Sequence, residues 1–140
     1  MDGQDGPPME VTTGLPQGSP VLPVLFCIYL SGVHGAVEER VQGARGISFV
    51  DDVTWFVEGG CIEEVAAGLE RCAQESIRWA RSNVVRSKAS KTEAILLSRK
   101  KGLGQQIGSR AIQVGDRRVS FAREATRWLE VWLDSALVGE

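Results

Sequence analysis

The chain has 140 residues, 43% hydrophobic and 24% charged, which is typical of one globular domain and excludes a disordered tail or a fibrous repeat. Its formal net charge is -2, so the chain as a whole is not a polycation. The charge is unevenly spread, however: residues 1–77 hold three basic and twelve acidic side chains, whereas residues 78–118 hold eleven basic and two acidic ones. One segment could bind cations and the other phosphates; the alternative is that the basic segment is a solvated helix face and loop.

The N-terminal part of the chain predicts a loop followed by a buried helix. Residues 1–17 are rich in Gly and Pro, with a short extended piece at 9–13. Ser19 is a good helix N-cap and Pro20 suits the first helical position, so we expect a helix over residues 20–30. Because this helix is apolar on every side, it should lie inside a larger fold.

Two neighbouring carboxylates are the first chemical feature. The β-rich runs 47–50 and 53–57 predict a hairpin with Asp51 and Asp52 at its tip. Adjacent carboxylates repel each other unless a cation neutralises them, and Mg²⁺ binds through one or two carboxylates plus substrate phosphates. Asp51 and Asp52 are therefore candidate metal ligands. The alternative is an ordinary solvated turn, where Asp is common.

The rest of the chain predicts one long helix followed by strands. Apolar residues at helical spacing, with Glu63 and Glu64 in the first turn, predict an amphipathic helix over 62–82. The expected strands are 93–98, a hairpin of 111–114 and 118–121 around Gly115-Asp116, and a final strand 127–133. This order favours an α+β fold, an antiparallel sheet with helices packed on one face.

The cysteine, histidine and apolar patterns restrict the setting of the protein. Three cysteines without a C-x-x-C pair point to a reduced, intracellular setting, nucleus or cytoplasm, without a disulfide framework. A single histidine excludes a multi-His zinc site. The first nineteen residues lack Lys and Arg, and the apolar run 21–33 is short and contains Pro23, so we expect neither a signal peptide nor a membrane partner.

Four segments in order resemble motifs of one family, the reverse transcriptase domain of non-LTR retrotransposons of the type common in filamentous fungi. The four segments are Gly14-Leu15-Pro16-Gln17-Gly18-Ser19-Pro20 (motif B), Phe49-Val50-Asp51-Asp52 (motif C), Lys91-Thr92-Glu93-Ala94-Ile95-Leu96 (motif D) and Trp128-Leu129-Glu130-Val131-Trp132-Leu133-Asp134 (motif E). Their order across nearly the whole chain is more specific than any single motif.

The resemblance implies a truncated polymerase palm with a two-metal reaction using Mg²⁺ or Mn²⁺. Asp51 and Asp52 would be catalytic metal ligands, and the partners would be an RNA template, a DNA primer and a dNTP. Gln17 and Gly18 would lie beside the nucleotide and template, where Gly18 allows close backbone approach. Lys91 would assist the leaving pyrophosphate as a cation or an acid.

By the same resemblance, Trp128 and Leu129 would form the primer grip. Each role has a structural alternative: Gln17 as a loop hydrogen-bonder, Lys91 as a solvated strand cap, and the tryptophans as core residues. The core role is favoured for Trp132.

The sequence also departs from the family. Motif A, which supplies a further metal-binding Asp, the fingers and the thumb have no counterpart in residues 1–140, and Glu130 replaces the usual Gly of motif E. We therefore expect a partial palm that is inactive alone and self-associates through exposed apolar surface. The alternatives are a non-catalytic nucleic-acid-binding remnant that uses the basic segment 78–118, or another metal-dependent nucleotidyl-transfer enzyme, for which motif B would be unexplained.

Overall fold

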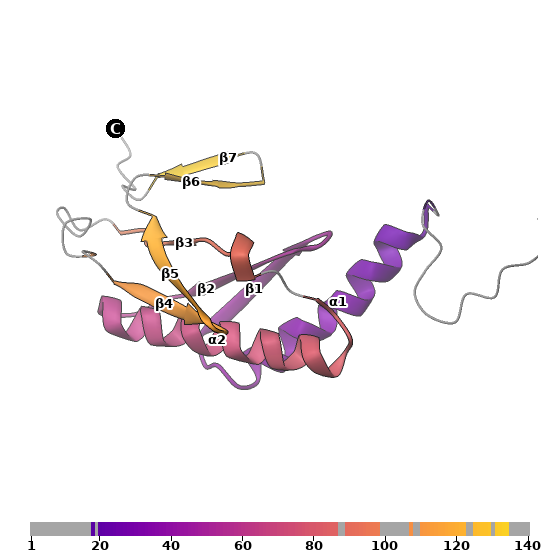
Figure 1. Ribbon diagram of the computed structural model, residues 1–140, viewed down its shortest axis with the longest axis horizontal. Coiled ribbons are helices and arrows are strands. Elements are labelled where there is room, and N and C mark those ends of the chain that lie inside the picture. The colour runs from indigo at the N-terminus through magenta and orange to yellow at the C-terminus, as the bar shows by residue number, and fades with distance from the viewer. Residues whose placement is uncertain are drawn as a thin grey trace, which may run out of the picture.

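The protein is described by a computed structural model, which covers residues 18, 20–86, 89–98, 107, 110–122, 125–129 and 131–134. Its elements, in order, are α1 (Leu22–Glu38), β1 (Ala44–Phe49), β2 (Asp52–Val57), α2 (Ile62–Ser82), the short 3₁₀ helix η1 (Ala89–Lys91), β3 (Ala94–Ile95), β4 (Ala111–Val114), β5 (Arg117–Ala122), β6 (Ala125–Trp128) and β7 (Val131–Asp134). Helices and strands follow one another without regular alternation (Figure 1). The predicted α+β class is confirmed.

The strands form three small sheets within the described residues. β1 pairs with β2 and β4 with β5, both antiparallel as predicted, and β6 pairs antiparallel with β7. β3 instead runs parallel to β5. Parallel pairing requires a crossover between distant segments, which local sequence patterns do not encode.

Helix α1 is longer than the predicted helix 20–30, and it begins later. It starts at Leu22 after an N-cap at Val21 that makes no side-chain capping bond, and the predicted cap Ser19 lies outside the described residues. The helix continues to Glu38 because Leu30, Val33 and Val37 recur at helical spacing and are buried. Packing against the rest of the protein therefore extends the helix through its glycines.

The first helix is buried on one side, and its N-terminal half carries the exposed apolar surface that the sequence predicts. Leu30, Val33 and Val37 form a core cluster with Val41, Ala44 and Cys72. The opposite side of the helix stays exposed, and we call its residues the α1 apolar face: Val21, Val24, Leu25 and Ile28, each between 42% and 65% exposed. This half of α1 extends away from the other elements (Figure 1).

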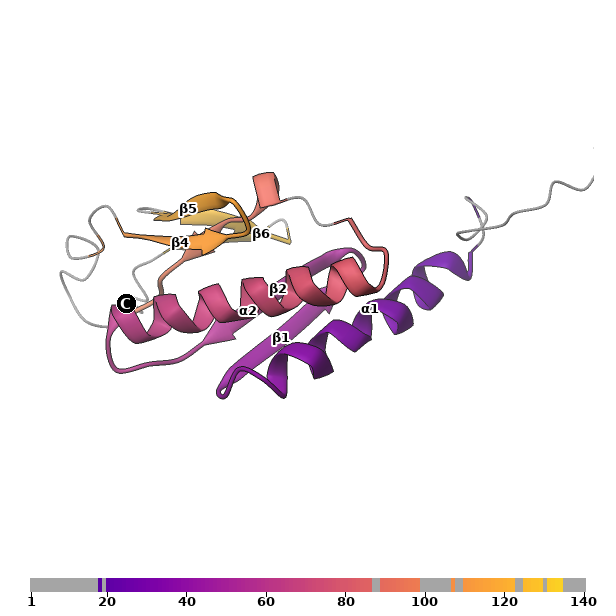
Figure 2. The same cartoon turned by 60° about the horizontal axis from the view of Figure 1, so that its bottom comes forward.

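Helix α2 has the predicted bounds and serves two hydrophobic clusters. Its Val65 packs with β4 and β5 residues such as Ile112 and Phe121, supported by Leu69 and Ile77. Cys72 packs instead with α1. Figure 2 accordingly shows α2 between the β4–β5 hairpin and the β1–β2 hairpin with α1.

Burial on the α1 side of this helix has a chemical consequence. It raises the pKa of the Cys72 thiol to about 11, because charged thiolate is disfavoured away from water. Cys72 is therefore the least reactive of the described cysteines, since Cys27 and Cys61 are exposed.

The end of the described chain differs from the prediction. Residues 127–133 do not form one strand: β6 and β7 form a hairpin in which Trp128 pairs with Val131. Leu129, which follows Trp128, has a φ of 47°. The hairpin escaped prediction because Leu129-Glu130 lacks the Gly, Asn or Asp that usually signals a tight turn. The predicted strand 93–98 is also shorter, since only Ala94 and Ile95 form β3.

Candidate active site

The β1–β2 hairpin displays the two predicted carboxylates. Phe49 pairs with Asp52, which leaves a two-residue turn of Val50 and Asp51. Asp51 lies in the turn, and Asp52 is the first residue of β2. Val50 has a φ of 54°, because tight hairpin turns need left-handed backbone that a β-branched residue seldom adopts.

Both carboxylates are open to solvent and available to a ligand. Asp51 and Asp52 are exposed, and within the described part of the chain neither carboxylate makes an ion pair or a hydrogen bond. Among these residues no group of three His, Cys, Asp or Glu side chains is placed to hold a metal. Two adjacent carboxylate oxygens suit Mg²⁺, which retains waters and takes the rest of its ligands from a substrate.

The face of the hairpin that carries Asp52 is open, and it is apolar apart from Asp52, Thr54 and one cation. Strand side chains alternate, so Asp52 shares its face with Thr54 and Phe56 of β2 and with their partners Phe49, Ile47 and the exposed Arg45 of β1. Phe49 is 60% exposed, and Ile47 is 49% exposed. This exposed surface beside two carboxylates can receive a flat or apolar group, such as a base or a sugar.

The opposite face of the β1–β2 hairpin packs against the helices, and the closest approach is at Gly46. A Cβ at Gly46 would lie 2.6 Å from Cζ3 of Trp55 and closer still to Nδ1 of His34. The His34 and Trp55 rings lie 5.3 Å apart, and His34 Nε2 hydrogen-bonds Ser48 Oγ. The position of the Asp51–Asp52 turn therefore depends on a close approach at Gly46.

The β6–β7 hairpin is tied to the open face of β1–β2 by Trp128. The indole Nε1 of Trp128 donates a hydrogen bond to Thr54 Oγ1 at 2.8 Å, and the ring packs edge-on to Phe56 at 6.2 Å. Thr54 and Phe56 were not predicted as site residues, although period-two alternation from Asp52 places them on the same face. The structure thus joins Trp128 to the hairpin that bears the carboxylates.

The other predicted site residues are not joined to the carboxylates by a hydrogen bond or ion pair within the described residues. Lys91 is exposed at the end of η1, and Leu129 is 36% exposed. Gly18 is exposed with a φ of 98°, a conformation that favours glycine. Gln17 lies outside the described residues.

The segment that follows Lys91 is also connected to β6. Glu93 Oε2 accepts a hydrogen bond from Thr126 Oγ1, and Thr126 is buried. Two side-chain contacts, at Thr126 and at Trp128, therefore hold the β6–β7 hairpin to segments that precede it by many residues. Neither helix of the described chain is long and apolar enough to cross a membrane.

Comparison with known proteins identifies one family. A family model described as Reverse transcriptase (RNA-dependent DNA polymerase) matches residues 1–131. The matched segment includes the Asp51–Asp52 turn, Lys91 and Trp128. Searches of curated proteins and of solved structures found no match.

Proposed function

Because this chain belongs to the reverse transcriptase (RNA-dependent DNA polymerase) family, we propose that it is part of the palm of such a polymerase from a non-LTR retrotransposon. One observation supports a catalytic role above the others: Asp51 and Asp52 are adjacent, exposed and without a protein partner among the described residues, at the turn of a docked hairpin. The non-LTR assignment is supported by the order of the four sequence motifs.

In the proposed reaction, Asp51 and Asp52 hold divalent ions, Mg²⁺ or Mn²⁺. The chemistry that such ions supply when bound is activation of a primer 3′-hydroxyl and stabilisation of charge on the transferring phosphoryl group. Gly18 allows the backbone to approach the nucleotide or template closely, and Gln17 beside it would contact them. Lys91 provides a positive charge or a proton for the departing pyrophosphate.

The β6–β7 hairpin acts in this proposal as a primer grip that is rigidly linked to the carboxylates. The indole N–H of Trp128 is already donated to Thr54, so the role of Trp128 in the primer grip is to hold the β6–β7 hairpin in place. Leu129, at the exposed turn, is then the residue that contacts the primer. RNA template, DNA primer and dNTP are the proposed partners.

We also propose that the 140-residue chain is inactive alone. Two-metal catalysis requires both ions and the nucleotide to be fixed together, and no group of three His, Cys, Asp or Glu side chains in the described residues is placed to hold a metal. In a primer-extension assay on an RNA template, the isolated chain is expected to incorporate no nucleotide. Template-dependent incorporation that disappears in Asp52→Asn would contradict this part of the proposal.

Metal binding tests the carboxylate assignment directly. In titration calorimetry, the chain is expected to bind Mg²⁺ or Mn²⁺ with a dissociation constant of about 1 mM, because Mg²⁺ gives up its waters reluctantly. Asp51→Asn and Asp52→Asn should each abolish the signal. The matched control is Asp116→Asn, which removes one carboxylate from the β4–β5 turn and should leave metal binding unchanged. An equal loss of metal binding in all three variants would refute a specific site at Asp51 and Asp52.

Self-association is the last part of the proposal, and it is supported by the α1 apolar face. We expect the chain to form dimers or larger species in sedimentation experiments, since burying this face removes apolar side chains from water. Ile28→Lys should weaken association about tenfold or more, because a charge would enter the interface unpaired. Ala67→Lys adds the same charge at an exposed position of α2 and should have no effect; association that survives Ile28→Lys would rule out this face.

A further inference from the structure

One side of α1 carries exposed residues at the spacing of a coiled-coil interface. We call these residues the α1 seam: Val24, Ile28, Ser31, Gly35 and Glu38, all exposed and separated by alternating steps of four and three. This spacing keeps side chains on one stripe of a helix and lets two helices pack along their length. Figures 1 and 2 show α1 at the margin of the molecule, with no other described element over its outer side. The seam is therefore open to a second helix.

The α1 seam has large side chains at its N-terminal end and small ones at its C-terminal end. Val24 is 58% exposed and Ile28 is 65% exposed, whereas a Cβ at Gly35 would meet nothing within 4 Å. If a second α1 lies antiparallel along the seam, Val24 faces Gly35 of the other copy and Ile28 faces Ser31. Each layer then combines a large side chain with a small one, which fills the space between the helices. A parallel pair would place Gly35 against Gly35 and leave a gap.

The two ends of α1 carry charges that do not match the helix dipole. The first turn has no acidic residue, the N-cap makes no side-chain capping bond, and the last turn has no basic residue. Glu38 and Glu39 lie instead at the C-terminal end, where the dipole is negative. Arg40 follows them but pairs with Glu75 of α2 at 3.6 Å. The positive end of α1 therefore lacks an acidic residue, and the negative end carries two.

These charges favour the same orientation as the side-chain sizes do. With Val24 opposite Gly35, an antiparallel pair brings Glu38 of one copy beside the first turn of the other α1, whose N–H groups attract a carboxylate. Glu38 is held at this end of the seam, because it accepts a hydrogen bond from the Gly46 amide at 3.0 Å. In a parallel pair the carboxylates of both copies would lie together and repel one another.

We propose that the α1 seam binds α1 of a second copy of this chain, antiparallel, about a two-fold axis that passes between the layers formed by Ile28 and Ser31. The inference rests on the self-association proposed above, and it adds the partner surface and the direction of packing. In a two-fold pair every contact occurs twice and both seams are covered. Association through the seam therefore stops at a dimer.

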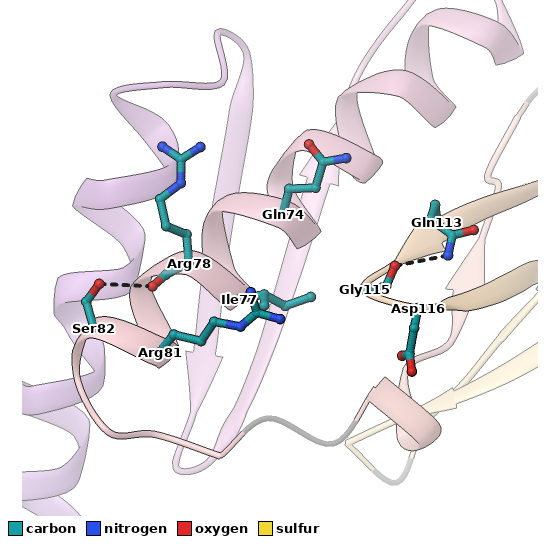
Figure 3. A pocket seen from close by; sticks show the side chains of 8 residues that line it. All are labelled: Gln74, Ile77, Arg78, Arg81, Ser82, Gln113, Gly115 and Asp116. Atoms are coloured by element: carbon teal, nitrogen blue, oxygen red, sulfur yellow. Dashed lines mark hydrogen bonds between the residues drawn. The ribbon is translucent and has the colours of Figure 1, made fainter.

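An open groove of about 610 Å³ between α2 and the β4–β5 turn is less suited to a second copy (Figure 3). Its helix wall includes Arg81, and its strand wall includes Asp116 and a Gln113 side chain that donates to the Gly115 carbonyl. Covering such polar groups removes them from water, which costs free energy unless a partner replaces every hydrogen bond. Arg81→Gln should accordingly leave the dissociation constant of the dimer unchanged.

Disulfide trapping tests the direction of the pair. Cys27→Ser with Cys61→Ser first removes the exposed thiols and leaves the buried Cys72. In this background, Val24→Cys with Gly35→Cys should give covalent dimers on mild oxidation, seen on non-reducing gels. The two positions are roughly 16–17 Å apart along one helix, too far for a disulfide within a chain. Each single variant should stay monomeric on the same gel, because Val24 faces Gly35 and not a second Val24.

The outcomes separate this inference from the self-association on which it rests. If Val24→Cys alone gives as much covalent dimer as the double variant, the helices are parallel and the proposed direction is wrong. If the unsubstituted chain sediments as a dimer but the double variant does not cross-link, another surface forms the dimer, and only this inference fails. A chain that sediments as a monomer at every concentration overturns both proposals.

A second measurement needs no cysteine. In sedimentation equilibrium, Gly35→Leu should weaken dimerisation about tenfold or more, because the added carbons overfill the layer that holds Val24. Since the space around Gly35 is open in the single chain, the variant should keep its helix content in circular dichroism. The control Ala67→Leu adds a leucine at an exposed position of α2 and should have no effect. Dimerisation that survives Gly35→Leu unchanged, or that Arg81→Gln weakens equally, would rule out the seam.

Discussion

Gly46→Ala is expected to destabilise the protein by about 1–3 kcal/mol, because an added methyl group forces well-packed neighbours apart. The methyl carbon would lie 2.6 Å from the Trp55 ring, and nearer to His34, on the face of β1 that docks against α1. The His34 ring cannot move away without disturbing its hydrogen bond with Ser48. The variant should unfold at a lower urea concentration when followed by circular dichroism.

The matched control is Gly35→Ala in α1. A Cβ at Gly35 meets nothing within 4 Å, and alanine is the better residue inside a helix, so this variant should gain about 0.5–1 kcal/mol. The same chemical change is thus expected to have opposite signs at two positions eleven residues apart. Equal stability of the two variants would contradict the close docking of the hairpin, and with it the placement of the Asp51–Asp52 turn.

Phe121→Ala should lower the free energy of unfolding by more than Gly46→Ala does, by about 3–5 kcal/mol, since it removes a large side chain from a packed core. Phe121 is 4% exposed and packs with Ile112, Val119 and Val65, so few neighbours can collapse into the space. Urea denaturation monitored by tryptophan fluorescence gives the free energy of unfolding. Phe121→Leu, which keeps most of the volume, should retain a measurable transition if the alanine variant does not fold.

Phe49→Ala provides the comparison for this prediction. Phe49 is 60% exposed on the open face of β1–β2, so Phe49→Ala creates no cavity. It should lower the free energy of unfolding by much less than Phe121→Ala does. A cost at Phe49 equal to that at Phe121 would mean that the open face is covered in solution. Self-association through that face would be the physical reason, and it would then depend on protein concentration.

The elements that were predicted correctly are those whose signals are local. The β1–β2 hairpin and the β4–β5 hairpin follow from alternating or β-branched runs, and α2 follows from apolar residues at helical spacing with Glu63 and Glu64 in its first turn. The C-terminal half of α1 was not predicted, and it contains Gly32 and Gly35, which are poor helix formers. It stays helical since Gly32 lets Trp79 pack against it, with Cζ2 of Trp79 3.2 Å from where a Cβ would be.

In the candidate site, too, the features with a local sequence signal were predicted and those that depend on distant residues were not. Two adjacent aspartates between β-rich runs predicted the turn with its carboxylates, and the structure confirms the hairpin, with Asp52 in β2 instead of in the loop. The bond between Trp128 and Thr54 links residues 74 positions apart, which no local pattern can reveal. The metal, nucleotide and primer roles of these residues remain predictions that the experiments above address.

The position of α2 between two hydrophobic clusters affects how the protein melts. Leu69 and Ile77 support the cluster of β4 and β5, and Cys72 and Trp79 belong to the cluster of α1 and the β1–β2 hairpin. If either cluster unfolded, a row of apolar side chains along α2 would be exposed to water. The cluster that stayed folded would then pack against a helix that is covered on one side only. The two halves therefore share one cooperative unit, in which neither can serve as a stable folding intermediate without the other.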